Sequence, residues 1–186
     1  SYLGSLKEQE TNELVWKNFE NARNMTDEFS CFRILSQISP ELKQKGSDRF
    51  YSRWKHDKLV LDKWFAVQAA SNLPDTLGKV ESLLSHWDFS MTNPNKVRSL
   101  LYVLALQNPL NFHRSDGQSY CFIADRILEL DKINPQIAAR LSSCFNHWKK
   151  YDKNRQQMMN DQLEKIMAVK SLSKNVYEIV SRALDQ

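Results

Sequence analysis

One stretch of the chain places two polar side chains of complementary chemistry on one helical face. It reads Asn134-Pro135-Gln136-Ile137-Ala138-Ala139-Arg140, and the Asn-Pro pair is typical of a helix start. Gln136 then stands in the first turn, four residues before Arg140, so their side chains share a face. The N-terminus of a helix favours an anion or a carbonyl oxygen, and arginine adds a planar fork of donors that suits a carboxylate. Spacing alone nevertheless favours an ordinary exposed or salt-bridged arginine over a ligand-binding one.

The side chains that usually break bonds in hydrolases are not arranged for catalysis here. No histidine belongs to a His-Glu-x-x-His pair, the helical arrangement that holds zinc beside a glutamate general base. Cys144 and His147 have a ligand-like spacing, but two ligands without a second pair predict packing or exposure rather than a metal site. The sequence also contains no glycine-rich phosphate loop and no Gly-x-Ser-x-Gly elbow. We therefore expect no catalytic residue, no metal ligand and no cofactor in this chain.

Charge and cysteine content limit the partners and the compartment. The net charge of +4, from 26 basic and 22 acidic side chains, does not predict a nucleic-acid-binding surface. Basic clusters at residues 49–58 and 149–155 are interpreted as solvated helix faces, although Trp148 and Tyr151 could stack on bases. No apolar run is long enough for a membrane span, and we expect no signal peptide, because the first residues have neither a basic region nor an apolar core. Three widely spaced cysteines in apolar helical contexts favour reduced, buried thiols and a cytoplasmic protein: Cys31, Cys121 and Cys144.

Prolines mark where the helices that carry these residues begin. Proline at the first helical position loses no hydrogen bond, and a preceding serine or asparagine caps the free N–H groups. Four such pairs predict four helix starts: Ser39-Pro40, Asn93-Pro94, Asn108-Pro109 and Asn134-Pro135. Leu73-Pro74-Asp75 is a variant with an acidic residue in the first turn, and Thr26-Asp27-Glu28 marks another start.

Composition and periodicity predict an all-α fold. Four glycines in 186 residues are too few for the tight turns of a multi-stranded sheet, and the common residues are good helix formers. Apolar residues recur at three and four, which predicts helices at 8–22, 26–38, 40–55, 58–71, 74–86, 94–107, 118–132, 135–147, 152–169 and 173–184, with a short turn at 109–113. Short connections between such helices force antiparallel neighbours, so we expect one domain, residues 1–186, built as an α-solenoid or curved array of antiparallel helix pairs. No strict repeat consensus is present.

Several runs resemble the C-terminal helical domain of bacterial-type aminopeptidase N. They cover almost the whole chain, in order and with short spacings kept, which is more specific than any single motif. The runs are Asn24-Met25-Thr26-Asp27, residues 62–69, residues 89–100, Asn108-Pro109-Leu110-Asn111-Phe112-His113, Asp116-Gly117, residues 134–140 and residues 151–156. Lys96, where relatives often carry arginine, and the basic segment at 148–150 are small departures.

The resemblance implies a part of a zinc-dependent exopeptidase that removes single N-terminal residues from peptides. In that family the zinc ligands and the general base lie in an upstream thermolysin-like domain, and the helical domain encloses a chamber that admits peptides. The resemblance implies that this chain is the later part of the helical domain, with the upstream domain and peptide substrates as partners and no activity of its own. It also implies a substrate-binding role for Gln136 and Arg140, because the matching glutamine and arginine in relatives reach toward bound substrate.

Two other functions remain open at this point. A free-standing α-solenoid could bind a partner in its concave groove as an interaction scaffold. Nucleic-acid binding through the basic helices ranks below both. If preceding helices are missing, an apolar edge would be bared near the first helix, with Leu14, Val15 and Phe19 as candidates.

Overall fold

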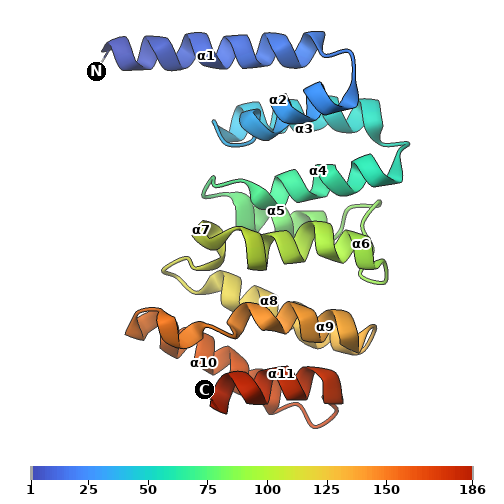
Figure 1. Ribbon diagram of the computed structural model, residues 1–186, viewed down its shortest axis with the longest axis vertical. Coiled ribbons are helices and arrows are strands. Elements are labelled where there is room, and N and C mark those ends of the chain that lie inside the picture. The colour runs from blue at the N-terminus through green and yellow to red at the C-terminus, as the bar shows by residue number, and fades with distance from the viewer. Residues whose placement is uncertain (1, 186) are drawn as a thin grey trace.

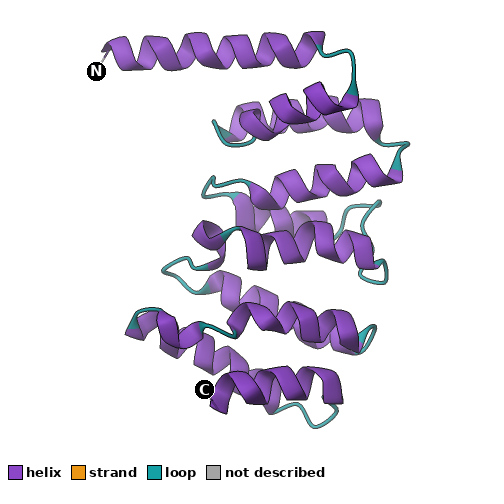
Figure 2. Ribbon diagram, viewed as in Figure 1, coloured by secondary structure: helices purple, strands orange, loops and turns teal. Residues whose placement is uncertain are grey.

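The chain folds as a stack of helices, and every regular element among residues 2–185 is helical (Figures 1 and 2). The computed structural model describes these residues, with side chains from Gln9 to Asp185. The α-helices are α1 (Tyr2–Asn21), α2 (Met25–Leu35), α3 (Pro40–Trp54), α4 (Lys58–Ala70), α5 (Thr76–Leu83), α6 (Pro94–Val97), α7 (Pro109–Phe112), α8 (Gln118–Asp131), α9 (Pro135–Ser142), α10 (Lys153–Met167) and α11 (Lys174–Asp185). A π-helix, η1 (Arg98–Gln107), continues α6, and two short 3₁₀ turns follow α9: η2 (Ser143–Phe145) and η3 (Trp148–Lys150).

The helices form two layers, as the predicted array of helix pairs requires. One layer contains α2, α4, η1, α9 and α11, in which η1 packs against α4 and α9 packs against α11. The other contains α3, α5, α8 and α10, which lie behind the first layer in Figure 1. Helix α1 lies at one end of the stack against α2, and α11 lies at the other end (Figure 1). The all-α, solenoid-like prediction is therefore confirmed.

The four predicted Ser/Asn-Pro starts are confirmed with their caps. Each places proline in the first turn, and each cap side chain accepts a backbone N–H from that turn: Ser39, Asn93, Asn108 and Asn134. Asn108 also donates to the carbonyl oxygens of Ala69 (2.9 Å) and Ser71 (2.8 Å), so one side chain starts α7 and satisfies the end of α4. A cap residue that bonds two elements fixes their relative positions.

Several helix boundaries differ from the predicted ones. Helix α5 begins at Thr76, and Asp75 occupies its cap without a side-chain cap bond, so Pro74 lies outside the helix. Helix α2 is capped by Asn24, whose side chain accepts from the Asp27 N–H, and it begins at Met25, one residue before the predicted start. The first helix begins at Tyr2 rather than at residue 8. The predicted helix 135–147 changes to 3₁₀ geometry after Ser142.

The core lies between the two layers and continues along the stack. Fully buried side chains occur from Phe19 in α1 through Leu104 in η1 and Tyr120 in α8 to Val180 in α11. Each helix pair buries its apolar faces against the next pair, so the core is continuous along the described residues.

Helix η1 is the least ordinary element of the first layer. Ten residues in π geometry are unusual, since π-helices occur mostly as single-turn bulges and often near functional sites. The predicted helix 94–107 is therefore correct in extent but wrong in geometry beyond Val97.

Candidate functional site

Gln136 and Arg140 lie side by side on the outer face of α9, as the spacing predicted. Both are exposed, whereas Ile137 and Leu141 are buried. Asn134 caps the helix by accepting the Ile137 N–H at 3.2 Å. Among the side chains of residues 9–185, neither Gln136 nor Arg140 has a hydrogen-bond or ion-pair partner. The structure thus supports the exposed reading of this arginine rather than the salt-bridged one, and leaves its donors free.

A buried tyrosine of the π-helix anchors the start of α9 beneath these two residues. The hydroxyl of Tyr102 donates to the carbonyl oxygen of Ile137 at 2.7 Å, and its ring is 7% exposed. Burial raises the pKa of Tyr102, while the nearby charges of Arg140 and Arg98 oppose that rise. Two guanidinium groups from different helices therefore lie close to one phenol. We call Arg98, Tyr102, Gln136 and Arg140 the α9 cluster.

Sequence reasoning missed Arg98 and Tyr102 as members of this cluster. Arg98 is exposed, and the only hydrogen bond of its side chain among the described residues is a 3.3 Å contact to the side chain of Asn95. It lies far from Arg140 in the sequence, and only the packing of η1 against α9 brings them together. Arg140 lies in the last turn of α9 rather than at its N-terminus. Neither guanidinium group has a carboxylate partner among residues 9–185, so both keep donors that suit an anion or a carbonyl oxygen.

The four histidines lie apart, and none lies in a group of His, Cys, Asp and Glu that could hold a metal within residues 9–185. His86 packs against the rings of Tyr51 and Trp64, and His113 is bonded to two tyrosines. His147 is exposed, and burial raises the pKa of the Cys144 thiol, which disfavours the thiolate that metals bind. The described residues do not fit a zinc site.

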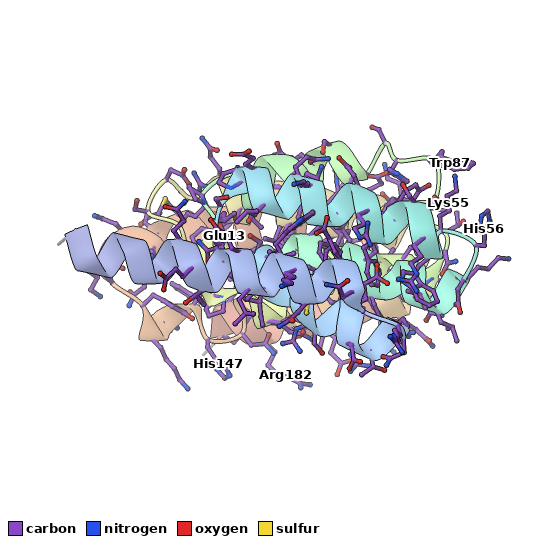
Figure 3. All side chains as sticks on the ribbon, turned by 90° about the horizontal axis from the view of Figure 1, so that it is seen from above. Glu13, Lys55, His56, Trp87, His147 and Arg182 are labelled. Carbon is purple, nitrogen blue, oxygen red and sulfur yellow. The ribbon has the colours of Figure 1, made fainter. Side chains whose placement is uncertain are left out.

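The expectation of three buried thiols needs correction, because Cys121 is exposed and Cys31 and Cys144 are half-buried. Trp87 is 79% exposed, and its indole N–H donates to the hydroxyl of Tyr51 at 2.8 Å. Figure 3 places Trp87 at the same edge of the stack as Lys55 and His56.

The basic clusters are partly engaged in holding the fold. Arg49 and Arg53 donate to the carbonyl oxygens of Glu20 and Ala22, which ties α3 to the end of α1. In the second cluster, Trp148 donates to Ala183 O at 2.8 Å and Tyr151 stacks on His113 with ring centroids 4.0 Å apart. These aromatic rings serve the core rather than a base-stacking surface. Within residues 2–185, no helix combines the length and apolarity that a membrane span requires.

The chain matches, over residues 1–185, the family model described as "Domain of unknown function (DUF3458_C) ARM repeats". The chain belongs to this family. Its ARM repeats are stacked helical units, which agrees with the two layers of helices described above.

Proteins similar to this chain include curated and solved aminopeptidases. Aminopeptidase N of Caulobacter vibrioides is 42% identical over 167 residues, which is 90% of this chain and 19% of that protein. Aminopeptidase N of Escherichia coli K12 is 36% identical over 171 residues, 92% of this chain and 20% of that protein. The crystal structure of Legionella pneumophila aminopeptidase A in complex with aspartic acid matches with 37% identity and a TM-score of 0.92, over 100% of this chain and 22% of that one. The chain spans about a fifth of the length of the curated relatives it matches.

Proposed function

We propose that this DUF3458_C domain is the helical wall of the substrate chamber in a zinc-dependent aminopeptidase of the aminopeptidase N type. In this role Gln136 and Arg140 position the peptide, and zinc chemistry belongs to a separate thermolysin-like domain upstream in the same protein. The observation that carries the proposal is that Gln136 and Arg140 are exposed and their side chains have no partner among residues 9–185, in a chain similar over nine tenths of its length to aminopeptidase N. The chain alone is expected to release no amino acid, because it offers neither zinc ligands nor a general base.

The geometry of the α9 cluster suits a positioning role. The Asn134 cap and the Tyr102 hydrogen bond hold the first turn of α9, so the backbone beneath Gln136 and Arg140 is fixed before a ligand arrives. The amide of Gln136 can both donate and accept, as peptide backbone requires, and Arg140 presents a planar fork to a carbonyl or carboxylate. Such groups orient a substrate without taking part in bond breaking.

The proposed protein acts on peptides in the cytoplasm. Three cysteines, Cys31, Cys121 and Cys144, form no disulfide among the described residues, which is usual in a reducing compartment.

Kinetics of the full-length aminopeptidase on substrates of increasing length test the proposal. Arg140→Ala should lower kcat/KM for tripeptides and longer peptides by about tenfold to a hundredfold, the value of a charge-assisted hydrogen bond. Alanine p-nitroanilide, which has little beyond its first residue, should be cleaved at the normal rate. Arg140→Lys should recover only part of the loss, because an ammonium group lacks the planar fork.

Arg182→Ala is the matched control. Arg182 is exposed on α11, where it pairs with Glu178 at 3.0 Å (Figure 3). Its removal should leave both substrate classes unaffected. An equal loss on short and long substrates in Arg140→Ala would instead mean that Arg140 supports the fold or a domain interface.

A further inference from the structure

A groove of about 900 Å³ opens on the first layer, between α2, α4 and η1. Its floor is apolar, with Ile34 and Ile38 on one side, Ala66 and Ala70 on the middle helix, and Val103 on the π-helix. Ile34 is 50% exposed, so a large apolar side chain of this groove lies open to solvent. An apolar concavity with an exposed isoleucine is a typical small-ligand surface.

Two polar side chains at this groove have free donors. Arg33 of α2 and Gln107 of η1 are both exposed, and neither side chain has a hydrogen bond or ion pair among residues 9–185. Gln37, by contrast, is fully used: it donates to the carbonyl of Ala70 and accepts the N–H of Asn72. The groove therefore offers an apolar floor, one free guanidinium and one free amide, which suits an apolar ligand with a carboxylate.

The π-helix connects this groove to the α9 cluster. Residues four or five apart share a face of a helix whose hydrogen bonds run from i to i+5. One stripe of the π-helix therefore contains Arg98, Gln107 and, between them, Tyr102 and Val103. Arg98 and Gln107, at its ends, are exposed, and the two residues between them are buried. The stripe is at most roughly 14 Å long at 1.5 Å per residue, the reach of about four residues of extended peptide.

We propose that the groove binds the C-terminal end of a peptide, with its last apolar side chain on the floor and its terminal carboxylate on Arg33. Gln107 then bonds to the peptide backbone. This inference rests on the proposed function and names its substrate class: short peptides that end in an apolar residue and reach the α9 cluster with their preceding residues.

Charge and size determine the choice of a peptide end as the occupant. The unpaired guanidinium of Arg33 favours an anionic ligand. The terminal carboxylate of a peptide supplies that anion, so the last side chain can be apolar and can contact the groove floor without burying a second charge. The groove has the volume of sites for small ligands, which is too small for a folded partner. A peptide of about five residues is long enough to follow η1 from Gln107, at the groove, to Arg98, in the α9 cluster.

Binding to the 186-residue chain tests the inference without catalysis. The probe is the pentapeptide Ala-Ala-Ala-Ala-Leu with fluorescein at its N-terminus, measured by fluorescence anisotropy. We expect it to bind about tenfold more tightly than the same peptide with a C-terminal amide. A peptide ending in Asp-amide carries a side-chain carboxylate but no terminal carboxylate, so it distinguishes the two kinds of carboxylate. We expect it to bind no better than the leucine amide.

Two variants place the site. Arg33→Gln should remove the difference in affinity between the peptide acid and the peptide amide. Ala70→Trp should fill the exposed floor of the groove and weaken the binding of both peptides. Arg23→Gln, an exposed arginine between α1 and α2 that does not line the groove, is the matched control and should bind as the unmodified chain does. Circular dichroism melts establish that each variant is folded.

Several outcomes would overturn the inference. They are equal affinity for acid and amide, tighter binding of the Asp-amide peptide, unchanged binding in Arg33→Gln, or no saturation up to about 1 mM. None of these outcomes changes the kinetics expected for Arg140→Ala. The inference about the groove can therefore be wrong while the proposed function stands. Conversely, a length-independent Arg140 effect with intact Arg33-dependent binding would overturn the role of the α9 cluster alone.

Discussion

At the scale of single residues, His113 has the most constrained environment of the four histidines. Its Nδ1 lies 2.9 Å from the hydroxyl of Tyr120, its Nε2 lies 2.7 Å from the hydroxyl of Tyr151, and Arg155 donates to its carbonyl oxygen at 2.8 Å. Burial lowers the pKa of His113 to about 4, and the charge of Arg155 adds to the effect. The neutral ring donates through one nitrogen and accepts through the other, so it joins α7, α8 and the start of α10.

This histidine should make the domain less stable in mild acid. Its pKa is about 4 when folded and near 6.5 when unfolded, so between these values the unfolded chain binds more protons. The stabilisation is fully present above pH 6.5 and is lost as pH falls toward 4. We expect the free energy of unfolding in urea to decrease by about 1–2 kcal/mol between pH 7 and pH 5, discounted for the partial exposure of the ring. His113→Gln should remove most of that decrease.

His147→Gln is the control, because His147 is exposed and outside this network. It should retain the pH dependence of the unmodified chain. His86, whose pKa is also lowered by burial, accounts for any remaining slope in His113→Gln. An unchanged slope in His113→Gln would show that this ring is protonated as easily in the folded chain as in the unfolded one.

At the scale of elements, the turn before α8 depends on one glycine. Gly117 has φ 67°, the left-handed region that other residues adopt at a cost, and a Cβ there would clash with Sδ of Met158. Gly117→Ala should therefore lower the free energy of unfolding by about 1–2 kcal/mol. Gly78, inside α5 with open space around it, is the matched control: Gly78→Ala should raise stability by about 0.5–1 kcal/mol. Equal effects of the two substitutions in urea titrations would contradict this account.

Which elements could be predicted depended on whether their signals are local. The pairs Ser39-Pro40 and Asn134-Pro135 specify cap and first turn with adjacent residues, and both were predicted correctly. The π geometry of η1 could not be predicted, because apolar residues at three and four give the same pattern for either helix type. The early part of α5 was misread because proline also suits a turn before a helix.

The candidate site was predictable in part for the same reason. Gln136 and Arg140 share one turn of one helix, so their common face follows from spacing. Arg98 and Arg33 lie on other helices, and their positions beside a cluster or groove depend on how η1 and α2 pack. No local pattern indicates that an exposed arginine lacks a carboxylate partner. Family resemblance supplied the role of Gln136 and Arg140, and that role stays a prediction.

At the scale of the whole molecule, the stack has two ends at which a helix has neighbours on one side only. At one end, α1 packs on α2, and its N-terminal part extends past the helices beneath it (Figure 1). Phe19, expected at a bared edge, is fully buried instead. Leu14 is 58% exposed, and Val15 and Trp16 are only partly buried, so part of the expected apolar edge is present.

This face of α1 should make the chain associate as its concentration rises. Leu14 and its partly buried neighbours lose water when two copies meet, and apolar area removed from water contributes about 25 cal/mol per Å². Sedimentation velocity should show dimers growing with concentration, and Leu14→Lys should keep the chain monomeric because a charge would be buried in the contact. Leu110→Lys is the matched control, since Leu110 is 63% exposed on α7, away from this end, and its loss should leave the dimers intact. A strict monomer at every concentration, or equal loss of dimers in both variants, would mean that α1 is not the contact.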